Sequence, residues 1–158
     1  MPKQVLNAAK IKIRKARNRD LDSIIGIEKR IAPSTMRKSQ YAAEFLNPFS
    51  HFHVACIPET GEIIGYFIFW IIEDIMEIHQ ITVSTEHQRK GIGSLLMQFL
   101  LDQAKQNKIS DIFLEVRQSN TTSIQFYQLF GFKKKSARKD YYQNPVENGL
   151  VLRKKMMV

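Results

Sequence analysis

The sequence has one cysteine, no apolar run long enough to span a bilayer, and no apolar leader at its start. A single cysteine cannot form an internal disulfide, and Cys56 lies in an apolar run that favours a buried, unreactive thiol. A membrane-spanning helix would need about 18 to 20 consecutive apolar residues. The opening residues MPKQVLNAAK also lack the apolar segment of a secretory signal. These absences predict a protein of the reducing cytoplasm that has no membrane partner.

Acidic residues are scarce relative to basic ones: there are 15 Asp and Glu against 24 Lys and Arg, a formal charge of +9 in 158 residues. The length suits one domain with a substantial core, so we expect a single domain over residues 1–158. The positive charge favours an anionic partner such as a phosphorylated cofactor, a nucleic acid or a ribonucleoprotein. General solubility explains the charge equally well, because net charge contains no information about the fold.

Glycine is also scarce, and two of the 7 glycines lie two residues apart in Gln88-Arg89-Lys90-Gly91-Ile92-Gly93-Ser94. This segment joins an apolar, strand-like run to a helix-like one. Glycines allow a tight turn and a close approach of a ligand to the main chain. The start of a helix offers unpaired N–H groups and the positive end of its dipole to a phosphate, which Arg89 and Lys90 can help to neutralise. The segment therefore predicts a loop that grips a diphosphate, with a strand-to-helix turn that binds nothing as the alternative.

A third glycine is missing from this loop. A dinucleotide-binding loop would need glycine at position 96, where this chain has Leu96. A P-loop is excluded as well, because no Gly-Lys-Ser/Thr triplet follows a glycine at the required spacing. The diphosphate must then belong to a cofactor of another kind.

Hydrophobic periodicity and turn residues predict one mixed α/β domain with the element order β-α-α-β-β-β-α-β-α-β-β. The three strands before the glycine loop imply an antiparallel meander, and a strand that directly follows a helix implies parallel pairing nearby. Pro33 ends the first helix and Ser34 caps the second. The expected ranges are strand 11–17, helices 21–31 and 34–46, strands 52–57, 62–72 and 75–83, helix 91–107, strand 112–116, helix 120–130 and a last strand at 149–157.

The glycine loop, with Val83 before it, resembles the Gln/Arg-x-x-Gly-x-Gly/Ala signature of the GNAT superfamily of N-acetyltransferases. A second block of that superfamily is similar to Leu114-Glu115-Val116-Arg117, Ser119-Asn120 and the segment from Phe126 to Phe132. With Asp140-Tyr141-Tyr142, the pattern is most similar to RimI-type acetyltransferases, and the close match covers residues 78–142. The resemblance implies a GNAT-like fold and acetyl-CoA as cosubstrate. RimI-type enzymes acetylate the N-terminal alanine of a small-subunit ribosomal protein.

The same resemblance implies which residues bind acetyl-CoA. The loop would hold the pyrophosphate, and the main chain of the preceding strand would pair with the pantetheine amides as an added strand does. One N–H group of that strand can also polarise the thioester carbonyl. Asn120 would bond the pantetheine arm, although a simple helix N-cap explains it too and both roles can hold. The implied residues are Ile81, Thr82, Val83, Gln88, Arg89, Lys90, Gly91, Ile92, Gly93, Ser94 and Asn120.

Glu115 and Tyr127 are the catalytic base and acid that the resemblance implies. A terminal amine has a reference pKa of about 7.7 to 8.0, so a carboxylate acting directly or through water suffices as base. A phenol with a reference pKa of about 10 can protonate a thiolate whose pKa is about 8.5. Spacing alone favours plainer interpretations. Glu115 would be a surface carboxylate paired with Arg117, and Tyr127 a core aromatic with a satisfied hydroxyl.

Glu77 and His79 are alternate residues of one strand and so share a face. Other GNAT branches place a catalytic glutamate near position 77, whereas RimI-type enzymes have no carboxylate there. The choice of base between Glu77 and Glu115 therefore stays open, and a solvent-facing contact between Glu77 and His79 is the alternative. His51 and His53 also share a strand face, but no further ligands lie nearby in the sequence, so we expect no metal site.

The basic run over residues 133–139 can meet ribosomal RNA or an acidic peptide, although such a run is more often a solvated face or a hairpin loop. Tyr141 and Tyr142 resemble a pair that lines the acceptor groove of RimI-type enzymes, with buried edge aromatics as the alternative.

We therefore predict direct transfer of an acetyl group, within a ternary complex, to the N-terminal α-amine of a protein. Cys56 takes no part in that mechanism. The first rival is a GNAT enzyme that acetylates a lysine side chain, a polyamine or an antibiotic. The second is a non-catalytic basic module that binds RNA, although the chain lacks the aromatic and basic signature of an RNA-recognition motif.

Overall fold

The computed structural model describes residues 10–31 and 36–157, and its helices and strands follow the predicted order. The lead-in over residues 1–9 and the expected boundary at Pro33 and Ser34 lie outside the described residues, and α2 begins at Lys38. The elements are β1 (Lys12–Lys15), α1 (Leu21–Ile31), α2 (Lys38–Glu44), β2 (Ser50–Cys56), β3 (Ile63–Ile72), β4 (Ile75–Val83), α3 (Ile92–Gln106), β5 (Asp111–Arg117), α4 (Thr121–Leu129), β6 (Lys133–Tyr142) and β7 (Glu147–Lys155).

All the strands belong to one 7-stranded sheet with the order β1-β2-β3-β4-β5-β7-β6. The predicted meander is confirmed, because β2, β3 and β4 pair antiparallel in succession. The predicted parallel pairing is confirmed as well, between β4 and β5. The basic run over residues 133–139 lies in β6, an exposed strand at the edge of the sheet, and not in a hairpin loop.

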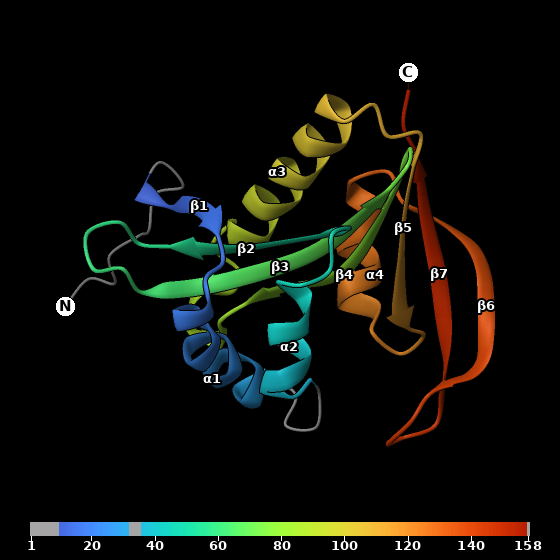
Figure 1. The fold of residues 1–158 in the computed structure, drawn as a ribbon. Coiled ribbons are helices and arrows are strands. Elements are labelled where there is room, and N and C mark those ends of the chain that lie inside the picture. Colours follow the sequence, from blue (N-terminus) through green and yellow to red (C-terminus); the bar gives the residue numbers. More distant parts are fainter. Residues whose placement is uncertain (1–9, 32–35, 158) are drawn as a thin grey trace.

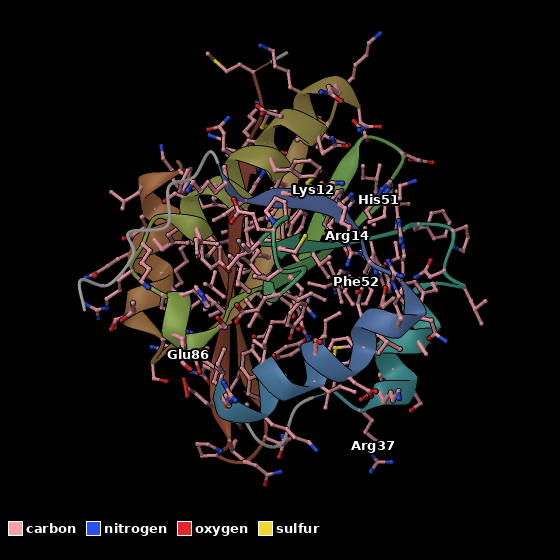
Figure 2. All side chains as sticks on the ribbon, turned by 90° about the vertical axis from the view of Figure 1, so that its left-hand side faces the viewer. Lys12, Arg14, Arg37, His51, Phe52 and Glu86 are labelled. Carbon is pink, nitrogen blue, oxygen red and sulfur yellow. The ribbon has the colours of Figure 1, made fainter. Side chains whose placement is uncertain are left out.

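Helices cover both faces of the sheet. In Figure 2, which looks at the β1 edge, α3 lies above the strands and α1 and α2 lie below them. The apolar stripe of α1 packs with Tyr41 of α2 and with Phe52 and Tyr66 of the sheet. The larger core joins α3 to β3, β4, β5 and β7, and α4 packs against it. Among the described residues, no helix combines the length and the apolar composition needed to cross a membrane.

The sheet opens in its middle, between β4 and β5. Figure 1 shows the two strands together where they begin and apart where they end. Their pairing over the described residues runs from Ile75 with Asp111 only as far as Ile78 with Leu114. Beyond that point β4 continues on β3 and β5 continues on β7. One edge of β4 therefore has main-chain groups that are not used by β5, which makes this opening the natural place for a ligand.

A β-bulge lies at the start of this opening. Phe69 pairs with Ile78 and Ile68 pairs with Gln80, so His79 has no partner on β3 in the register described for these strands. A bulge bends its strand and redirects the side chain of the extra residue. The bulge therefore bends β4 at the position where its pairing with β5 ends.

Candidate active site

The predicted diphosphate loop connects β4 to α3 through two residues with positive φ, Arg89 at 61° and Gly91 at 80°. Within the described chain, the first backbone hydrogen bond of α3 runs from Leu95 N to Gly91 O at 3.1 Å. The N–H groups of residues 91–94 therefore have no acceptor within the helix and point outward from its start. A Cβ on Gly91 would meet nothing within 4 Å. The loop therefore presents main-chain donors in open space, as a diphosphate requires.

A cavity of about 390 Å³ lies against this loop, between the end of β4 and α4. Gln88 fixes its wall, because its Nε2 donates to Val83 O at 3.0 Å and so ties the loop to the strand. The side chain of Ile92 is buried in the core, and therefore only its main chain can face a ligand. Among the predicted acetyl-CoA-binding residues, Ile81, Val83, Gln88, Arg89, Gly91, Gly93 and Ser94 line this cavity.

A second cavity of about 260 Å³ continues from the first into the opening between β4 and β5. It shares Ile81, Ser123 and Tyr127 with the first cavity. The predicted residues Thr82 and Asn120 line it. Asn120 also caps α4, since its Oδ1 accepts from Ser123 N at 3.2 Å, which confirms the N-cap interpretation.

A third cavity of about 700 Å³ lies on the other side, between β4, β5 and the β6–β7 hairpin. It shares His79, Glu115 and Tyr142 with the second cavity. Tyr141 also lines it and is 44% exposed, so this aromatic pair faces the cavity and is not a buried edge. The three cavities follow one another from the glycine loop to the basic strand β6, and each shares lining residues with the next.

Glu115 stands where the second and third cavities meet. The pairing with Arg117 that its spacing favoured is wrong. Arg117 instead lies 3.7 Å from Glu147 and donates to the carbonyl oxygen of Gln143 at 2.8 Å. Glu115 pairs with Arg138, whose Nη2 lies 3.3 Å from its Oε1. In the sheet, Glu115 of β5 lies opposite Val151 of β7. Because β7 pairs in turn with β6, the side-chain partner of Glu115 comes from β6, across the hairpin.

Tyr127 lies in α4 where the first and second cavities meet. Its ring packs edge-on against Phe126 and Phe132, at centroid distances of 5.4 and 5.8 Å. Burial, with a smaller contribution from Tyr142, raises the pKa of Tyr127 to about 12. The hydroxyl therefore keeps its proton at neutral pH and can act only as a donor of that proton. The side chain combines the core packing and the cavity position that the two interpretations of the sequence proposed separately.

A buried carboxylate on α1, Glu28, was not predicted from the sequence. Glu28 accepts a hydrogen bond from the hydroxyl of Tyr66, whose oxygen also lies 2.9 Å from the hydroxyl of Tyr41 and 2.9 Å from the side-chain amide of Gln80. Burial and the Glu28 contact raise the pKa of Tyr66. Glu28 and Gln80 both line the second cavity. A signal was present, because Glu28 follows Leu21 and Ile24 at helical spacing and so lies on the apolar stripe.

Glu77 and His79 make the contact that was expected of two neighbours on one strand face. Nε2 of His79 lies 3.3 Å from Oε2 of Glu77, and both side chains remain partly exposed, at 38% and 46% respectively. The ring of Trp70 lies 4.2 Å from the His79 ring, centroid to centroid. Both members of the pair line the third cavity. They are therefore part of the site and not only of the surface.

A group of three side chains that could ligate a metal lies elsewhere. Potential ligand atoms of Glu62, Glu86 and His87 lie within 4.8 Å of one another. The two glutamates are exposed, and Arg30 already pairs with Glu86 at 2.8 Å. Glu86 is labelled in Figure 2. We assign no metal to these residues.

The architecture is an opened mixed sheet with a glycine turn at the start of its central helix. The sequence profile of the Acetyltransferase (GNAT) family matches residues 17–132, and the chain belongs to that family. Enzymes of this family use acetyl-CoA. The predicted superfamily, fold class and enzyme class are thereby confirmed.

Individual relatives within the family are similar over most of the chain. A protein of Bacillus subtilis (strain 168), provisionally named a ribosomal protein bS18-alanine N-acetyltransferase, is 30% identical over 144 residues, which are 90% of this chain and 94% of the relative. The ribosomal protein bS18-alanine N-acetyltransferase of Escherichia coli (strain K12) is 26% identical over 123 residues, 78% of this chain and 81% of the relative. The crystal structure of the ribosomal-protein-S18-alanine N-acetyltransferase from Escherichia coli has a TM-score of 0.85 at 22% identity, covers 94% of this chain and 95% of its own, and confirms the fold.

Proposed function

We propose that the chain transfers the acetyl group of acetyl-CoA to the N-terminal α-amine of a protein, namely the N-terminal alanine of a small-subunit ribosomal protein, in the cytoplasm. The observation that carries the proposal is the path of three cavities through the opened sheet. A donor can enter from the glycine loop and an acceptor from the β6–β7 hairpin, so both can be bound at once. Direct transfer needs such a ternary complex. It needs no nucleophilic cysteine, and Cys56 is buried away from these three cavities.

Acetyl-CoA would occupy the first two cavities. The N–H groups of residues 91–94 suit its pyrophosphate, and Arg89 and Lys90 add positive charge beside it. The unshared edge of β4 at Ile81, Thr82 and Val83 suits the pantetheine amides in the manner of an added strand. Asn120, at the start of α4, would bond the pantetheine arm from the other side. The thioester would then lie near Tyr127.

Glu115 and Tyr127 would divide the proton transfers between them. The acceptor nitrogen forms its bond to the acetyl carbon, and the carbon–sulfur bond of the thioester breaks. Glu115 takes a proton from the nitrogen, and the Tyr127 hydroxyl gives its proton to the departing thiolate. General acid and base catalysis of this kind typically contributes about 10²- to 10⁴-fold to the rate. The phenol of Tyr127 is protonated when the thiolate forms, and the same burial that raises its pKa to about 12 makes it a weaker acid than free tyrosine.

Relatives support the choice of a terminal amine as acceptor. The Escherichia coli and Bacillus subtilis relatives have names that specify the alanine of ribosomal protein bS18. A relative from Sulfurisphaera tokodaii, 28% identical over 144 residues, is named an N-alpha-acetyltransferase. All three names specify a protein α-amine, whereas a lysine side chain, with a reference pKa of about 10.4, would demand a stronger base.

The test is thiol release from acetyl-CoA, measured with a panel of acceptors, followed by mass spectrometry of ribosomal proteins incubated with the enzyme. We expect turnover with a peptide that begins with the alanine of a small-subunit protein. The same peptide with a blocked N-terminus and intact lysines is the matched control and should be inert. A preference for polyamines or for the blocked peptide would contradict the proposal. Tight RNA binding without thiol release would favour the non-catalytic alternative.

A variant tests the base. Glu115→Gln keeps the size and polarity of the side chain but removes the carboxylate that takes the proton. We expect kcat to fall by about 10²-fold with little change in the affinity for acetyl-CoA. Titration calorimetry with coenzyme A checks that affinity. Turnover close to that of the unmodified enzyme would remove Glu115 from the mechanism and would leave Glu77 as the carboxylate to examine.

A further inference from the structure

A fourth cavity, of about 410 Å³, lies on β6 and β7 beside the third one. Figure 1 shows these two strands side by side at the end of the sheet opposite β1. Apart from one glycine, every residue that lines this cavity is basic, and we call the cavity the basic groove. Its lining residues are Gly131, Lys133, Lys134, Lys135, Arg153 and Lys155.

The cations of the basic groove have little negative charge to offset them. Among the described residues, Arg153 is the groove residue with a recorded ion pair, in which its Nε donates to Oδ1 of Asp111 at 2.7 Å. A further cation lies beside the groove, since Nζ of Lys154 lies 2.8 Å from the position that a Cβ on Gly131 would take. The groove therefore attracts anions of more than one charge.

The sheet register holds these cations together at a cost. Lys133 of β6 lies directly opposite Arg153 of β7. Like charges that face each other across a strand pair destabilise a sheet. A bound polyanion would remove this repulsion, so the free groove is prepared for one.

An aromatic ring joins the basic groove to the third cavity. Nζ of Lys135 lies 4.8 Å from the centroid of the Phe113 ring, and the guanidinium carbon of Arg153 lies 5.9 Å from it. Phe113 and Lys135 also line the third cavity. Surfaces that bind single-stranded nucleic acids combine a positively charged groove with aromatic side chains in this way.

An acidic peptide is the rival polyanion, and the shape of β6 disfavours it. Such a peptide would bind most simply as an added strand along the free edge of β6. Register shifts between Lys134 and Ser136 and between Arg138 and Tyr142 interrupt that edge. A phosphate backbone needs no continuous row of main-chain groups, because ammonium and guanidinium groups bind phosphates directly.

We propose that the basic groove binds the phosphate backbone of single-stranded RNA, at a site separate from the one that transfers the acetyl group. Lys135 lines both the groove and the third cavity, so RNA in the groove would lie beside the entrance for the acceptor. An acceptor protein that is itself bound to that RNA would be retained close to Glu115. This use of the groove rests on the proposed function, whereas the binding of RNA does not.

The test measures the binding of a fluorescently labelled oligouridylate by anisotropy, with coenzyme A in excess to occupy the glycine loop. The groove variant carries Lys133→Gln, Lys134→Gln and Lys155→Gln. We expect its Kd for the oligonucleotide to rise by about tenfold or more, and its salt dependence, as the slope of log Kd against log salt concentration, to become shallower by about 2, because each phosphate contact on a single strand contributes about 0.7.

A control variant carries Lys12→Gln, Lys29→Gln and Lys105→Gln, which removes the same charge from exposed positions outside the groove. It should bind the oligonucleotide as the unmodified enzyme does. Equal weakening in both variants would mean that net charge alone attracts RNA, and it would overturn the proposal. Both variants should release thiol with the alanine-initiated peptide at the rate of the unmodified enzyme, which shows that they are folded.

Competitors identify the occupant. Polyglutamate should not displace the oligonucleotide at equal charge concentration, and tighter binding of polyglutamate would assign the groove to an acidic peptide instead. Displacement of the oligonucleotide by coenzyme A would place the RNA at the glycine loop and would also contradict the proposal. If the unmodified enzyme binds RNA through the groove but acetylates no peptide, the proposed function fails and the groove stands. Acetylation without RNA binding overturns the groove alone.

Discussion

The proposed donor side and the proposed acceptor side of this site are built in different ways. Most of the donor side is one segment, from Ile81 to Ser94, that presents main-chain groups at the edge of β4 and at the start of α3, and α4 forms the opposite wall. The acceptor side gathers side chains from strands that are distant in sequence, among them Glu77 of β4, Glu115 of β5 and Arg138 of β6. Main-chain recognition depends on backbone conformation, whereas side-chain recognition depends on which residue stands at each position.

This difference implies that the two sides can change independently. The donor side tolerates many side chains as long as the backbone keeps its conformation. The acceptor side changes with every substitution on β4, β5 or β6, and the ion pairs there are exposed enough to rearrange cheaply. A GNAT chain can thus keep its cosubstrate while its acceptor changes. Substitutions that affect only the donor side or only the acceptor side test whether the two sides are independent.

Tyr127→Phe should have the largest effect, because Tyr127 lines both cavities proposed for acetyl-CoA and would give its proton to the thiolate there. The phenyl ring keeps the contacts with Phe126 and Phe132 but has no proton to give. We expect kcat to fall by about 10²- to 10⁴-fold with an unchanged affinity for acetyl-CoA, measured by thiol release and calorimetry. If turnover remains within a fewfold of the unmodified enzyme, the thiolate leaves without this acid and the role of Tyr127 is only structural.

Acid pH should act on the fold before it acts on either side of the site, through His53. Burial, followed by the charges of His51 and Lys15, lowers the pKa of His53 from 6.5 to about 4. Between these values the unfolded chain binds more protons than the folded one, so the free energy of unfolding falls as pH falls. We expect a loss of about 2 kcal/mol between about pH 6.5 and pH 4.5, measured by urea denaturation.

A substitution at His53 separates this effect from catalysis. His53→Leu removes the titrating ring from β2 and should flatten the stability profile over the same pH interval. His51, whose pKa burial also lowers, retains a smaller effect of the same sign. A profile that is equally steep in the variant would assign the acid sensitivity to other groups.

Gly91→Ala should sharpen the comparison by damaging the donor side alone. Gly91 has φ at 80°, and a residue with a Cβ costs about 1 to 2 kcal/mol in that conformation. If the loop relaxes to avoid this strain, its N–H groups turn away from the diphosphate. We expect the KM for acetyl-CoA to rise by about tenfold while the KM for the peptide stays the same.

Gly61→Ala is the matched control for the loop. Gly61 has φ at 74° and equally open surroundings, but it lies in the turn between β2 and β3. It should lower stability to a similar extent and leave both KM values unchanged. An equal rise in the KM for acetyl-CoA in the two variants would mean that general destabilisation, and not the loop, is responsible.

Arg138→Gln should have the smallest effect, on the acceptor side alone. The ion pair of Arg138 with Glu115 is 57% and 31% exposed, and pairs of this kind contribute less than about 1 kcal/mol. We expect kcat/KM for the peptide to fall by about threefold and the KM for acetyl-CoA to stay constant. Lys133→Gln, on the same strand, removes an equal charge without touching Glu115 and provides the comparison. Equal losses in both variants would point to net charge instead of the pair.

The turn at the start of α3 could be predicted from the sequence because its signal is local. Gly91 and Gly93 with the preceding strand specify a backbone conformation over a few residues, and the resemblance to a family then supplied the ligand. The order of the elements followed from periodicity for the same reason. The direct partner of Glu115 could not be predicted, because Arg138 reaches it only through the pairing of β5 with β7 and of β7 with β6.

Glu28 shows a different limit. Its position on the apolar stripe of α1 can be seen in the sequence, but its partner Tyr66 comes from β3, and Tyr66 in turn contacts Gln80 of β4. Each of those residues looks unremarkable in its own strand. The bulge that places His79 is similarly invisible, because it is a property of the register between β3 and β4 and not of either strand alone.

The basic strand β6 has a consequence for how copies of this protein behave toward one another. As the last strand of the sheet, β6 has one edge without a neighbouring strand in the described chain, and such an edge can recruit a strand from another molecule. Its exposed lysines would bring like charges together in any such addition. The register shift between Arg138 and Tyr142 further interrupts the edge. These two features guard the acceptor side against edge-to-edge aggregation, so that β6 remains accessible at high protein concentration.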